Sequence, residues 1–436
     1  MVLESFLNPR SIAIIGASSK PGKVGYALAK KLQAFQGEVF FVNKNCGSIF
    51  GRGVVPSVLE IKEDVDLGII AVPAVAVPQV VEECGRKGIR AVIVISAGFA
   101  EAGNVRKQRE LVGIAKKFRM RLLGPNCFGV VNTSLNLDAT FARLSPMKGS
   151  VSLVSQSGAL WSTIAEYSRA ERLGFGKVVT LGDAADVDFC EVIEYLERDK
   201  QTRVIVLYIE ALSDGRKFMR VVQKCKKPVI ALKAGKSDAG MRAALSHTGS
   251  LAGSYEVYKA AFKQSGALVA ESLSEALDVA RYCSLQSFVS GKRVVVVTNA
   301  GGPGILVVDA LRESGFEIVA LPRKVKEKLP KAWSGNNPID VLGDADELRY
   351  RLVFEALAEN VFFDGVVVVL TPQFMVDPER VAREVVIFSK KVRKPVVCCF
   401  MGFESVESAR EVLEKNNVPC FFDPERVARV LGKLKE

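Results

Sequence analysis

The amino-acid sequence predicts an α/β fold made of three consecutive domains, each built around an open and mostly parallel sheet. Short apolar runs alternate with amphipathic stretches along the chain, which is typical of parallel strands that are buried on both faces. The alternation also restarts twice, shortly after residues 147 and 289. We therefore expect domains at residues 1–146, 147–288 and 289–436, each with its ligand edge at the carboxyl ends of the strands.

The composition is that of a globular protein. Of the 436 residues, 49% are hydrophobic and 25% are charged, and no apolar run reaches the roughly 20 residues that a membrane span needs. The N-terminal segment MVLESFLNPRS lacks the basic and apolar regions of a signal peptide. We therefore expect a cytoplasmic protein with no membrane segment.

The net charge of +12 arises from 60 Lys and Arg residues against 48 Asp and Glu residues. Such a charge suits a nucleic acid, an anionic small molecule or an acidic partner subunit. The basic residues are dispersed along the predicted helices, without an arginine-rich tail or a basic stripe interleaved with aromatic residues. This distribution favours a phosphorylated ligand, and we expect no nucleic-acid partner.

The first domain combines buried strands with a glycine-rich turn. The apolar runs SIAII, VFFV, LGIIAV and AVIVIS lie at residues 11–15, 39–42, 67–72 and 91–96. The turn GASSKPGKVG follows the first of these strands and leads into a helix. Its glycines, Gly16, Gly22 and Gly25, supply the tight turn and the close approach that a pyrophosphate needs.

The end of the second strand indicates which nucleotide is bound. A site for NAD requires Asp or Glu there, whereas this strand ends in VFFVNKN, with Lys44. A lysine favours a phosphorylated ribose, as in coenzyme A or NADP, and Lys20 and Lys23 in the turn support the same interpretation. Two polar loops, at residues 95–103 and 123–129, are predicted at the same edge of the sheet.

The second domain contains the only histidine of the chain, His247, in the polar loop ALSHTGSLAG. A histidine in such a loop can carry a phosphoryl group on a ring nitrogen and move between sites. Glu210 follows the apolar strand VIVLYI, and its carboxylate could hold the opposite ring nitrogen. The segments SQSG and NAGGPG each lead from a strand into a helix, and a helix start of this kind suits an anion.

Six motifs, in this order, resemble the alpha subunit of the ADP-forming acetate–CoA ligases, which belong with the succinyl-CoA synthetases. The motifs are GASSKPGKVG, ISAGFAEAG, GPNCFG, VSQSGAL, LSHTGSLAG and TNAGGPG. The resemblance implies a Rossmann-like CoA-binding domain followed by two flavodoxin-like ligase domains. It also implies that acyl-CoA, phosphate and ADP give free acid, CoA and ATP, through an acyl phosphate and a phosphohistidine.

The resemblance further implies a set of site residues. His247 would be phosphorylated and Glu210 would orient it. The CoA site would contain Gly16, Ala17, Ser18, Ser19, Lys20, Gly22, Lys44, Ile95, Ser96, Ala97 and Asn126. The two phosphate-binding helix starts would contain Ser155, Ser157, Gly158, Asn299, Gly301, Gly302 and Gly304. No metal site is expected in this chain.

The three domains leave no segment for an ATP-grasp domain. The resemblance therefore implies a separate ATP-grasp beta subunit that holds ADP or ATP with Mg, in a heterotetramer of two subunits of each kind. Two alternatives stay open. An NADP-dependent oxidoreductase would use the first domain but would leave the SHTGS loop without a role. A non-catalytic CoA-binding sensor would bind CoA without forming a phosphohistidine.

Overall fold

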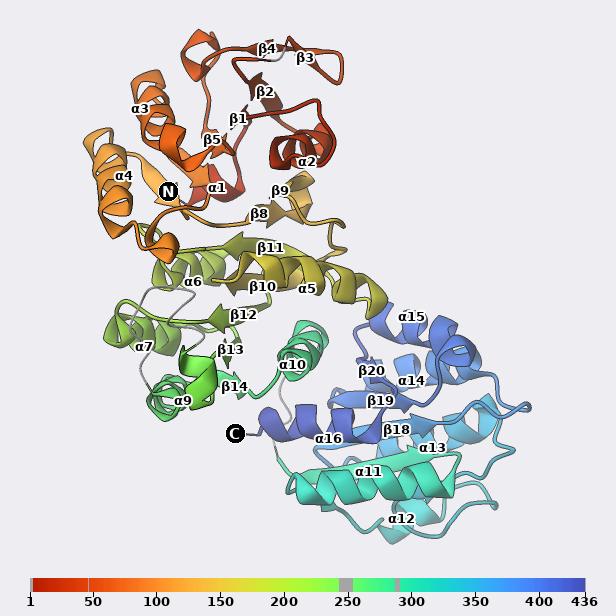
Figure 1. Cartoon of the computed structure of the whole chain (residues 1–436). Coiled ribbons are helices and arrows are strands. Elements are labelled where there is room, and N and C mark those ends of the chain that lie inside the picture. Colours follow the sequence, from red (N-terminus) through yellow and green to blue (C-terminus); the bar gives the residue numbers. More distant parts are fainter. Residues whose placement is uncertain (1–2, 46, 243–253, 287–290, 436) are drawn as a thin grey trace. The chain divides into compact units, whose positions relative to one another are not determined.

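The computed structural model describes residues 3–45, 47–242, 254–286 and 291–435. The chain forms two compact units, Met1–Glu271 and Ser272–Glu436. Both are α/β structures with largely parallel sheets, which confirms the predicted fold class (Figure 1). The domain boundaries at residues 146 and 288 stay a prediction.

The first unit begins with a seven-stranded sheet in the order β3-β4-β2-β1-β5-β6-β7. Its strands are β1 Ser11–Ile15, β2 Glu38–Val42, β3 Ser48–Ile49, β4 Arg52–Val55, β5 Leu67–Ile70, β6 Ala91–Val94 and β7 Arg121–Leu123. Neighbouring strands are parallel except for the short pair β3 and β4. The strand predicted at residues 11–15 is β1, and the other three predicted strands correspond to β2, β5 and β6.

Helices cover both faces of this sheet (Figure 1). They are α1 Glu4–Leu7, α2 Val24–Lys31, α3 Val77–Lys87 and α4 Val105–Lys117. Ile12 and Ile14 pack with the α2 side of the core, whereas Ala13 and Ile15 pack with α3 and α4. Because successive side chains of a strand point to opposite faces, this pattern explains why the strand is apolar at every position.

A second sheet in the same unit has the order β14-β13-β12-β10-β11-β8-β9. Its strands are β8 Gly129–Asn132, β9 Leu137–Thr140, β10 Lys148–Ser155, β11 Phe175–Thr180, β12 Val204–Ile209, β13 Val229–Lys233 and β14 Leu268–Ala270. The central strands are parallel, whereas the hairpin β8–β9 joins β11 in the antiparallel sense. A segment that precedes residue 146 thus completes the second sheet, and one hydrophobic core runs from the first sheet into the second.

The helices around the second sheet are α5 Gly158–Ala170, α6 Phe189–Arg198, α7 Gly215–Lys224 and α9 Tyr255–Gln264. Three of them begin with a side-chain cap, since Ser157, Asp188 and Asp214 accept hydrogen bonds from backbone N–H groups of the first turn. Such caps satisfy N–H groups that have no partner within the helix. The caps therefore define where each strand-to-helix loop ends.

The second unit holds one sheet in the order β16-β15-β18-β19-β20, with β17 paired to β15. The strands are β15 Arg293–Thr298, β16 Glu317–Ile318, β17 Ile339–Asp340, β18 Gly365–Leu370, β19 Val396–Phe400 and β20 Cys420–Phe421. The helices are α10 Leu273–Leu285, α11 Gly301–Glu313, α12 Arg323–Lys326, α13 Glu347–Glu359, α14 Pro378–Val392, α15 Glu407–Lys415 and α16 Pro424–Lys433. Helices α13, α14 and α15 share a core with alternate residues of the parallel strands.

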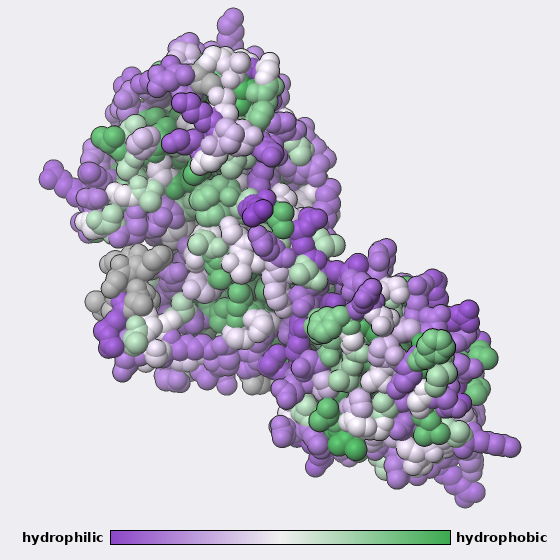
Figure 2. Space-filling view, turned by 45° about the vertical axis from the view of Figure 1, so that its right-hand side comes forward, coloured by the Kyte–Doolittle hydropathy of each residue, from purple (hydrophilic) through white to green (hydrophobic). Residues whose placement is uncertain are grey.

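Hydrophilic residues cover most of the face of the chain that Figure 2 shows, with hydrophobic residues in small groups between them. Within the described ranges, no helix is both long and apolar enough to cross a bilayer.

Candidate functional site

A cavity of about 570 Å³, here called the first cavity, opens at the carboxyl ends of β1 and β2. Its lining includes Gly16 and Ser18 from the glycine-rich turn and Asn43 and Lys44 from the end of β2. The charged residues of this lining are two lysines, Lys23 and Lys44, and one glutamate. The resulting positive charge suits an anionic ligand. The first cavity therefore lies where the sequence predicts a phosphorylated nucleotide.

Two positions of the turn require glycine, because other backbone atoms approach them closely. Gly16 has a φ of +94°, and a Cβ atom there would lie 2.4 Å from the backbone oxygen of Ala71. A Cβ atom on Gly25 would lie 1.9 Å from the backbone oxygen of Gly16. Only glycine fits at either position, which brings the start of α2 against the end of β1.

The remaining predicted residues of the turn have other positions. Ala17 is fully buried, and its backbone oxygen accepts a hydrogen bond of 2.7 Å from Asn43 Nδ2. Ser19, Lys20 and Gly22 lie in the same turn but not in the cavity lining. Sequence reasoning did not assign Asn43 a role, although it directly precedes Lys44 at the end of the strand. Its side chain links the end of β2 to the turn.

A second cavity, of about 440 Å³, adjoins the first, because Val24, Ala71 and Val72 line both. The predicted residues Ile95, Ser96, Ala97 and Asn126 contribute to the second cavity from the first sheet's loops, and Ser157 and Gly158 contribute from the start of α5. Residues that are distant in sequence thus meet here. Two adjoining cavities of this kind can hold the two ends of one long ligand.

The start of α5 presents the positive end of its helix dipole to the second cavity. Ser157 caps the helix, because its hydroxyl oxygen accepts a hydrogen bond of 3.3 Å from Leu160 N. Ser155 is fully buried, and its hydroxyl donates to the backbone oxygen of Ser157 at 2.8 Å. The positive end of the helix dipole therefore points toward the cavity from a fixed loop.

Aromatic rings form the wall that adjoins the start of α5. Phe128 and Phe141 lie against each other, with ring centroids 3.5 Å apart, and both line the second cavity. A Cβ atom on Gly158 would lie 2.8 Å from Phe128 Cδ2, so the ring rests directly on the helix start. The cavity thus combines the positive end of a helix dipole with an apolar wall, which suits a small acyl group beside a phosphate.

Gln156 connects this cavity to Glu210. Its Oε1 atom accepts hydrogen bonds from Glu210 N at 2.7 Å and from Ala211 N at 2.9 Å. Glu210 follows the last residue of β12, as predicted, and only 7% of its surface is exposed. Sequence reasoning did not assign Gln156 a role, although it lies between the predicted residues Ser155 and Ser157.

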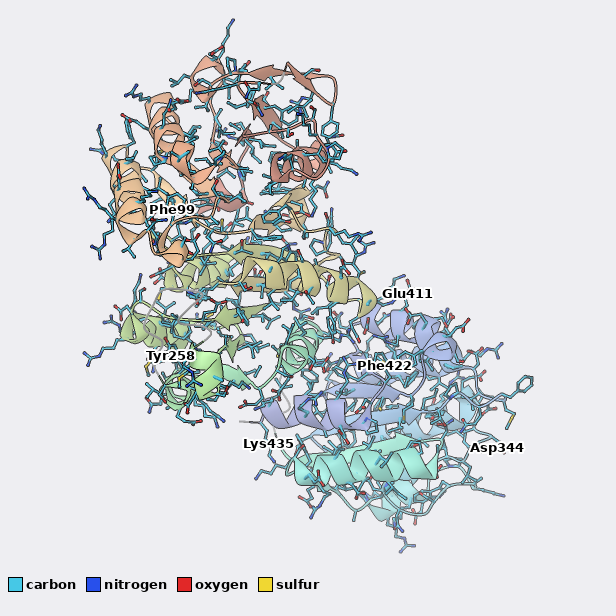
Figure 3. The ribbon with its side chains drawn as sticks, in the orientation of Figure 1. Phe99, Tyr258, Asp344, Glu411, Phe422 and Lys435 are labelled. Atoms are coloured by element: carbon cyan, nitrogen blue, oxygen red, sulfur yellow. The ribbon has the colours of Figure 1, made fainter. Side chains whose placement is uncertain are left out.

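A buried lysine accompanies Glu210. Lys233 ends the neighbouring strand β13, in register with Ile209, and is 2% exposed. Its ammonium lies 4.7 Å from the ring centroid of Tyr258, which Figure 3 labels on α9. Burial lowers the pKa of Lys233, and the negative charge of Glu210 opposes that change. Opposite charges therefore lie near each other at this edge of the second sheet.

His247 lies outside the described residues, as does the rest of the segment 243–253. The described chain resumes at residue 254, immediately before α9. The prediction that His247 carries a phosphoryl group is therefore neither confirmed nor contradicted by the geometry.

The start of α11 in the second unit contains the other predicted phosphate residues. Asn299 is fully buried; its Oδ1 atom accepts from Thr371 N at 2.9 Å, and its Nδ2 donates to the backbone oxygen of the same residue. Gly301 and Gly302 are exposed in the first turn of the helix. A Cβ atom on Gly304 would lie 2.9 Å from Thr298 Cγ2, so this glycine lets α11 approach the end of β15.

Three family models match consecutive parts of the chain. A CoA binding domain matches residues 10–133, a succinyl-CoA ligase like flavodoxin domain matches residues 148–283, and a Ligase-CoA domain matches residues 294–435. The first match contains the first cavity. The second and third contain the helix starts of α5 and α11.

The chain is similar along its whole length to named proteins. It is 43% identical to the alpha subunit of acetate–CoA ligase [ADP-forming] II of Pyrococcus furiosus, over 98% of this chain and 96% of that protein. It is 44% identical to acetate–CoA ligase [ADP-forming] I of Archaeoglobus fulgidus, over 99% of this chain. The chain spans 63% of the length of that second relative.

A solved structure has the same fold. It is the acetyl-coenzyme A synthetase 1 of Ca. Korarchaeum cryptofilum in complex with phosphate and ADP. The similarity covers 99% of this chain and 96% of that chain, with a TM-score of 0.92 and 34% identity.

Proposed function

The chain belongs to the family of the ADP-forming acetate–CoA ligases, as its six motifs predict, and on this premise we propose that it is the alpha subunit of an ADP-forming acyl-CoA synthetase. The proposed reaction converts acyl-CoA, phosphate and ADP into the free acid, CoA and ATP. The observation that carries the proposal is the pair of adjoining cavities. They connect the nucleotide edge of the first sheet to the start of α5 through Val24, Ala71 and Val72.

In this proposal the two cavities divide one acyl-CoA molecule between them. The first cavity takes the phosphorylated nucleotide, where Lys23 and Lys44 provide positive charge. The second cavity takes the thioester and the acyl group, which lie against Phe128 and Phe141. The loop of Ser96 and the turn of Asn126 form the wall nearest the first sheet.

Acyl transfer would take place at the start of α5. A phosphate oxygen attacks the thioester carbonyl carbon, the C–O bond forms, the C–S bond breaks, and CoA leaves as the thiolate. Helix N–H groups near Gly158 and the helix dipole favour the anionic phosphate and the charge that develops on the carbonyl oxygen. The product is an acyl phosphate.

Phosphoryl transfer would then use His247. A ring nitrogen attacks phosphorus, the P–O bond to the acyl group breaks, and the free acid leaves. Glu210 would hold the other ring nitrogen, and Gln156 fixes the backbone of Glu210 for that purpose. The start of α11, with Asn299, Gly301, Gly302 and Gly304, would receive the phosphoryl group on its way to the nucleotide.

We further propose that a separate ATP-grasp beta subunit binds ADP with Mg, in a cytoplasmic heterotetramer of two subunits of each kind. The alpha-subunit name of the Pyrococcus furiosus relative supports a partner of this kind. Mg on the partner would shield the charge between the phosphoryl group and ADP. The NADP-dependent oxidoreductase is not favoured by the relatives, and a non-catalytic CoA-binding sensor would leave both helix starts without a role.

The substitution His247→Ala tests the proposal. With the ATP-grasp partner, acetyl-CoA, phosphate and ADP present, we expect ATP formation to fall by more than about a thousandfold, because the group that carries the phosphoryl is lost. Radiolabel from ATP should appear on the original chain and be lost in acid but kept in base.

CoA binding to His247→Ala, measured by calorimetry, provides the control and should remain close to that of the original chain. Full ATP-forming activity in the variant would refute the phosphohistidine. An original chain that binds CoA but never takes up acid-labile label would support the sensor instead.

A further inference from the structure

Two carboxyl groups meet beside the second cavity, and the proposed reaction does not use them. Asp183 follows β11, and Glu101 lies in the short helix Ala100–Ala102 that follows β6. The Glu101 carboxyl lies close enough to that of Asp183 to share a hydrogen bond with it when one of the two is protonated. The Oδ2 atom of Asp183 is buried, and among the described residues no hydrogen-bond donor reaches it.

Glu101 holds the loop that supplies Ser96 and Ala97 to the second cavity. Its Oε1 atom accepts from Gly98 N, and its Oε2 atom accepts from Phe99 N at 3.0 Å. Phe99 is fully buried in the core of the first sheet and is labelled in Figure 3. The conformation of this loop therefore depends on where the Glu101 carboxyl lies.

Asp183 holds the adjoining part of the same wall, through Asn126. Its Oδ1 atom accepts a hydrogen bond of 3.2 Å from Asn126 Nδ2, and its backbone N–H donates to the oxygen of Pro125 at 3.0 Å. Asn126 has a φ of +56°, and its own N–H donates to the oxygen of Ser96 at 3.0 Å. Three loops from two sheets thus meet at Asp183.

A negative charge on each of two adjacent carboxyl groups is unfavourable in a partly buried site, because like charges repel and burial disfavours each charge. Burial, and next the neighbouring Glu101, raise the pKa of Asp183 from 3.8 to about 7. A proton on Asp183 Oδ2 supplies the missing donor. One proton shared by the two groups would explain both why Asp183 Oδ2 is buried without another donor and why the Glu101 carboxylate lies beside it.

We propose that Asp183 and Glu101 share a proton and act as a positioning pair, which holds Asn126 and the Ser96–Ala97 loop around the acyl end of acyl-CoA. Loss of the proton places two negative charges side by side and releases this wall. The positioning role rests on the proposed function, because it assumes that the second cavity takes the thioester. The shared proton does not depend on that assumption.

The other charged groups of these loops have partners of their own. Asp186 Oδ2 accepts from Arg121 Nε at 2.8 Å, and Asp188 pairs with Lys217 at 2.9 Å. The thiol of Cys127 is buried, and burial raises its pKa to about 12. Among the described groups of these loops, Asp183 is thus the one whose pKa lies near neutral pH.

The variant Asp183→Asn tests the positioning role. Asparagine carries an NH₂ donor at every pH, so it replaces the shared proton permanently and keeps an oxygen for Asn126. In the full assembly, the KM for acetyl-CoA of the original chain should rise by up to about tenfold per pH unit above pH 7, with little change in kcat. The KM of the variant should stay flat over the same range. The same rise in KM in both proteins would overturn the proposal.

Asp186→Asn is the matched control, because it removes a carboxylate from the same loop. Loss of the Asp186 carboxylate breaks its ion pair with Arg121 and should lower thermal stability. The pH at which KM begins to rise should stay that of the original chain. A midpoint in the original chain that moves with added Mg²⁺ or Ca²⁺ would show a cation between the two carboxyl groups and would also overturn the proposal.

Thermal unfolding tests the shared proton without any activity. A carboxyl group whose pKa is raised in the folded state binds more protons folded than unfolded, so it lowers stability as pH rises from about 4 to about 7. Asp183→Asn should not show that loss. The change in its Tm from pH 4 to pH 8 should therefore be about 2–4 °C more favourable than the same change in the original chain.

Infrared difference spectra should show a protonated carboxyl C=O band that disappears near pH 7 in the original chain and is missing in the variant. If catalysis fails in all variants but this titration is seen, the proposed function is wrong and the proton pair stands. A missing titration in an active enzyme would overturn the pair alone.

Discussion

The starts of α5 and α11 have the same construction but different surroundings. In each, the last residue of the strand donates its hydroxyl to the backbone oxygen two residues later, as Ser155 does to Ser157 and Thr298 does to Ala300. The next residue ties the loop to the end of the neighbouring strand with its amide side chain. Gln156 binds Glu210 N beyond β12, and Asn299 binds Thr371 N beyond β18.

The surroundings differ in capping, polarity and charge. Ser157 caps α5 with its side chain, whereas the residue at the equivalent position of α11, Ala300, has no side-chain cap. An aromatic ring lies on Gly158, but a Cβ atom on Gly301 would lie 3.3 Å from the carboxylate oxygen Asp340 Oδ2. The shared construction fixes both helix starts in place. The differences suit the separate tasks of the proposed function, in which acyl chemistry takes place at α5 and a more polar step at α11.

Of the substitutions that test this comparison, Gly158→Ala should have the largest effect. The new Cβ atom would collide with Phe128 and displace it from the wall of the second cavity, where a shift of about 1 Å can cost about 100-fold in rate. We expect kcat to fall by that order in the ATP-forming assay. Gly302→Ala is the control, because a Cβ atom there would meet no atom within 4 Å. Equal losses in the two variants would remove the distinction between the helix starts.

Asp340→Asn should have an intermediate effect. Removal of a negative charge beside the start of α11 should strengthen phosphate binding by about threefold, since a carboxylate there competes with the anion for the helix dipole. The amide still accepts from Leu342 N, as Asp340 Oδ1 does at 2.8 Å. The measurement is the KM for inorganic phosphate in the full assembly.

Asp344→Asn changes the charge by the same amount and serves as the control. Asp344, labelled in Figure 3, is exposed and pairs with Arg349 at 2.6 Å. It should leave the KM for phosphate unchanged. If the two variants respond alike, net charge and not the helix start explains the effect.

Exchange of the caps should have the smallest effect. Ser157→Ala should destabilise the first unit by about 1 kcal/mol, and Ala300→Ser should stabilise the second by a similar or smaller amount. Each unit contains one of the two tryptophans, Trp161 and Trp333, so fluorescence during urea unfolding can follow the units separately. A change in the unit that was not substituted would show that the two do not respond independently.

Local patterns predicted the strands and loops well. The apolar run at residues 11–15 is β1, Glu210 follows β12 as expected, and the two helix starts fall where SQSG and NAGGPG place them. These features depend on neighbours within about ten residues, which a sequence displays directly. Some of the predicted site residues line a cavity, and all of these lie in the two adjoining cavities of the first unit.

Features that depend on distant residues were missed. Asp183 and Asn126 are 57 positions apart, and neither belongs to a pattern that signals their contact. The assignment of β8 and β9 to the second sheet was equally hidden, because a hairpin contains no local sign of which sheet it joins. The role of His247 stays a prediction, because the residue lies outside the described ranges.

The hairpin β8–β9 also constrains how the chain can fold during synthesis. β8 pairs with β11, which is made much later, so the N-terminal part leaves the ribosome with a strand whose hydrogen-bonding groups lack their final partner. Such an edge invites pairing with other chains until β11 arrives. A fragment that ends at residue 146 would carry this exposed edge permanently. An isolated nucleotide-binding fragment should therefore end before Gly129, where β8 begins.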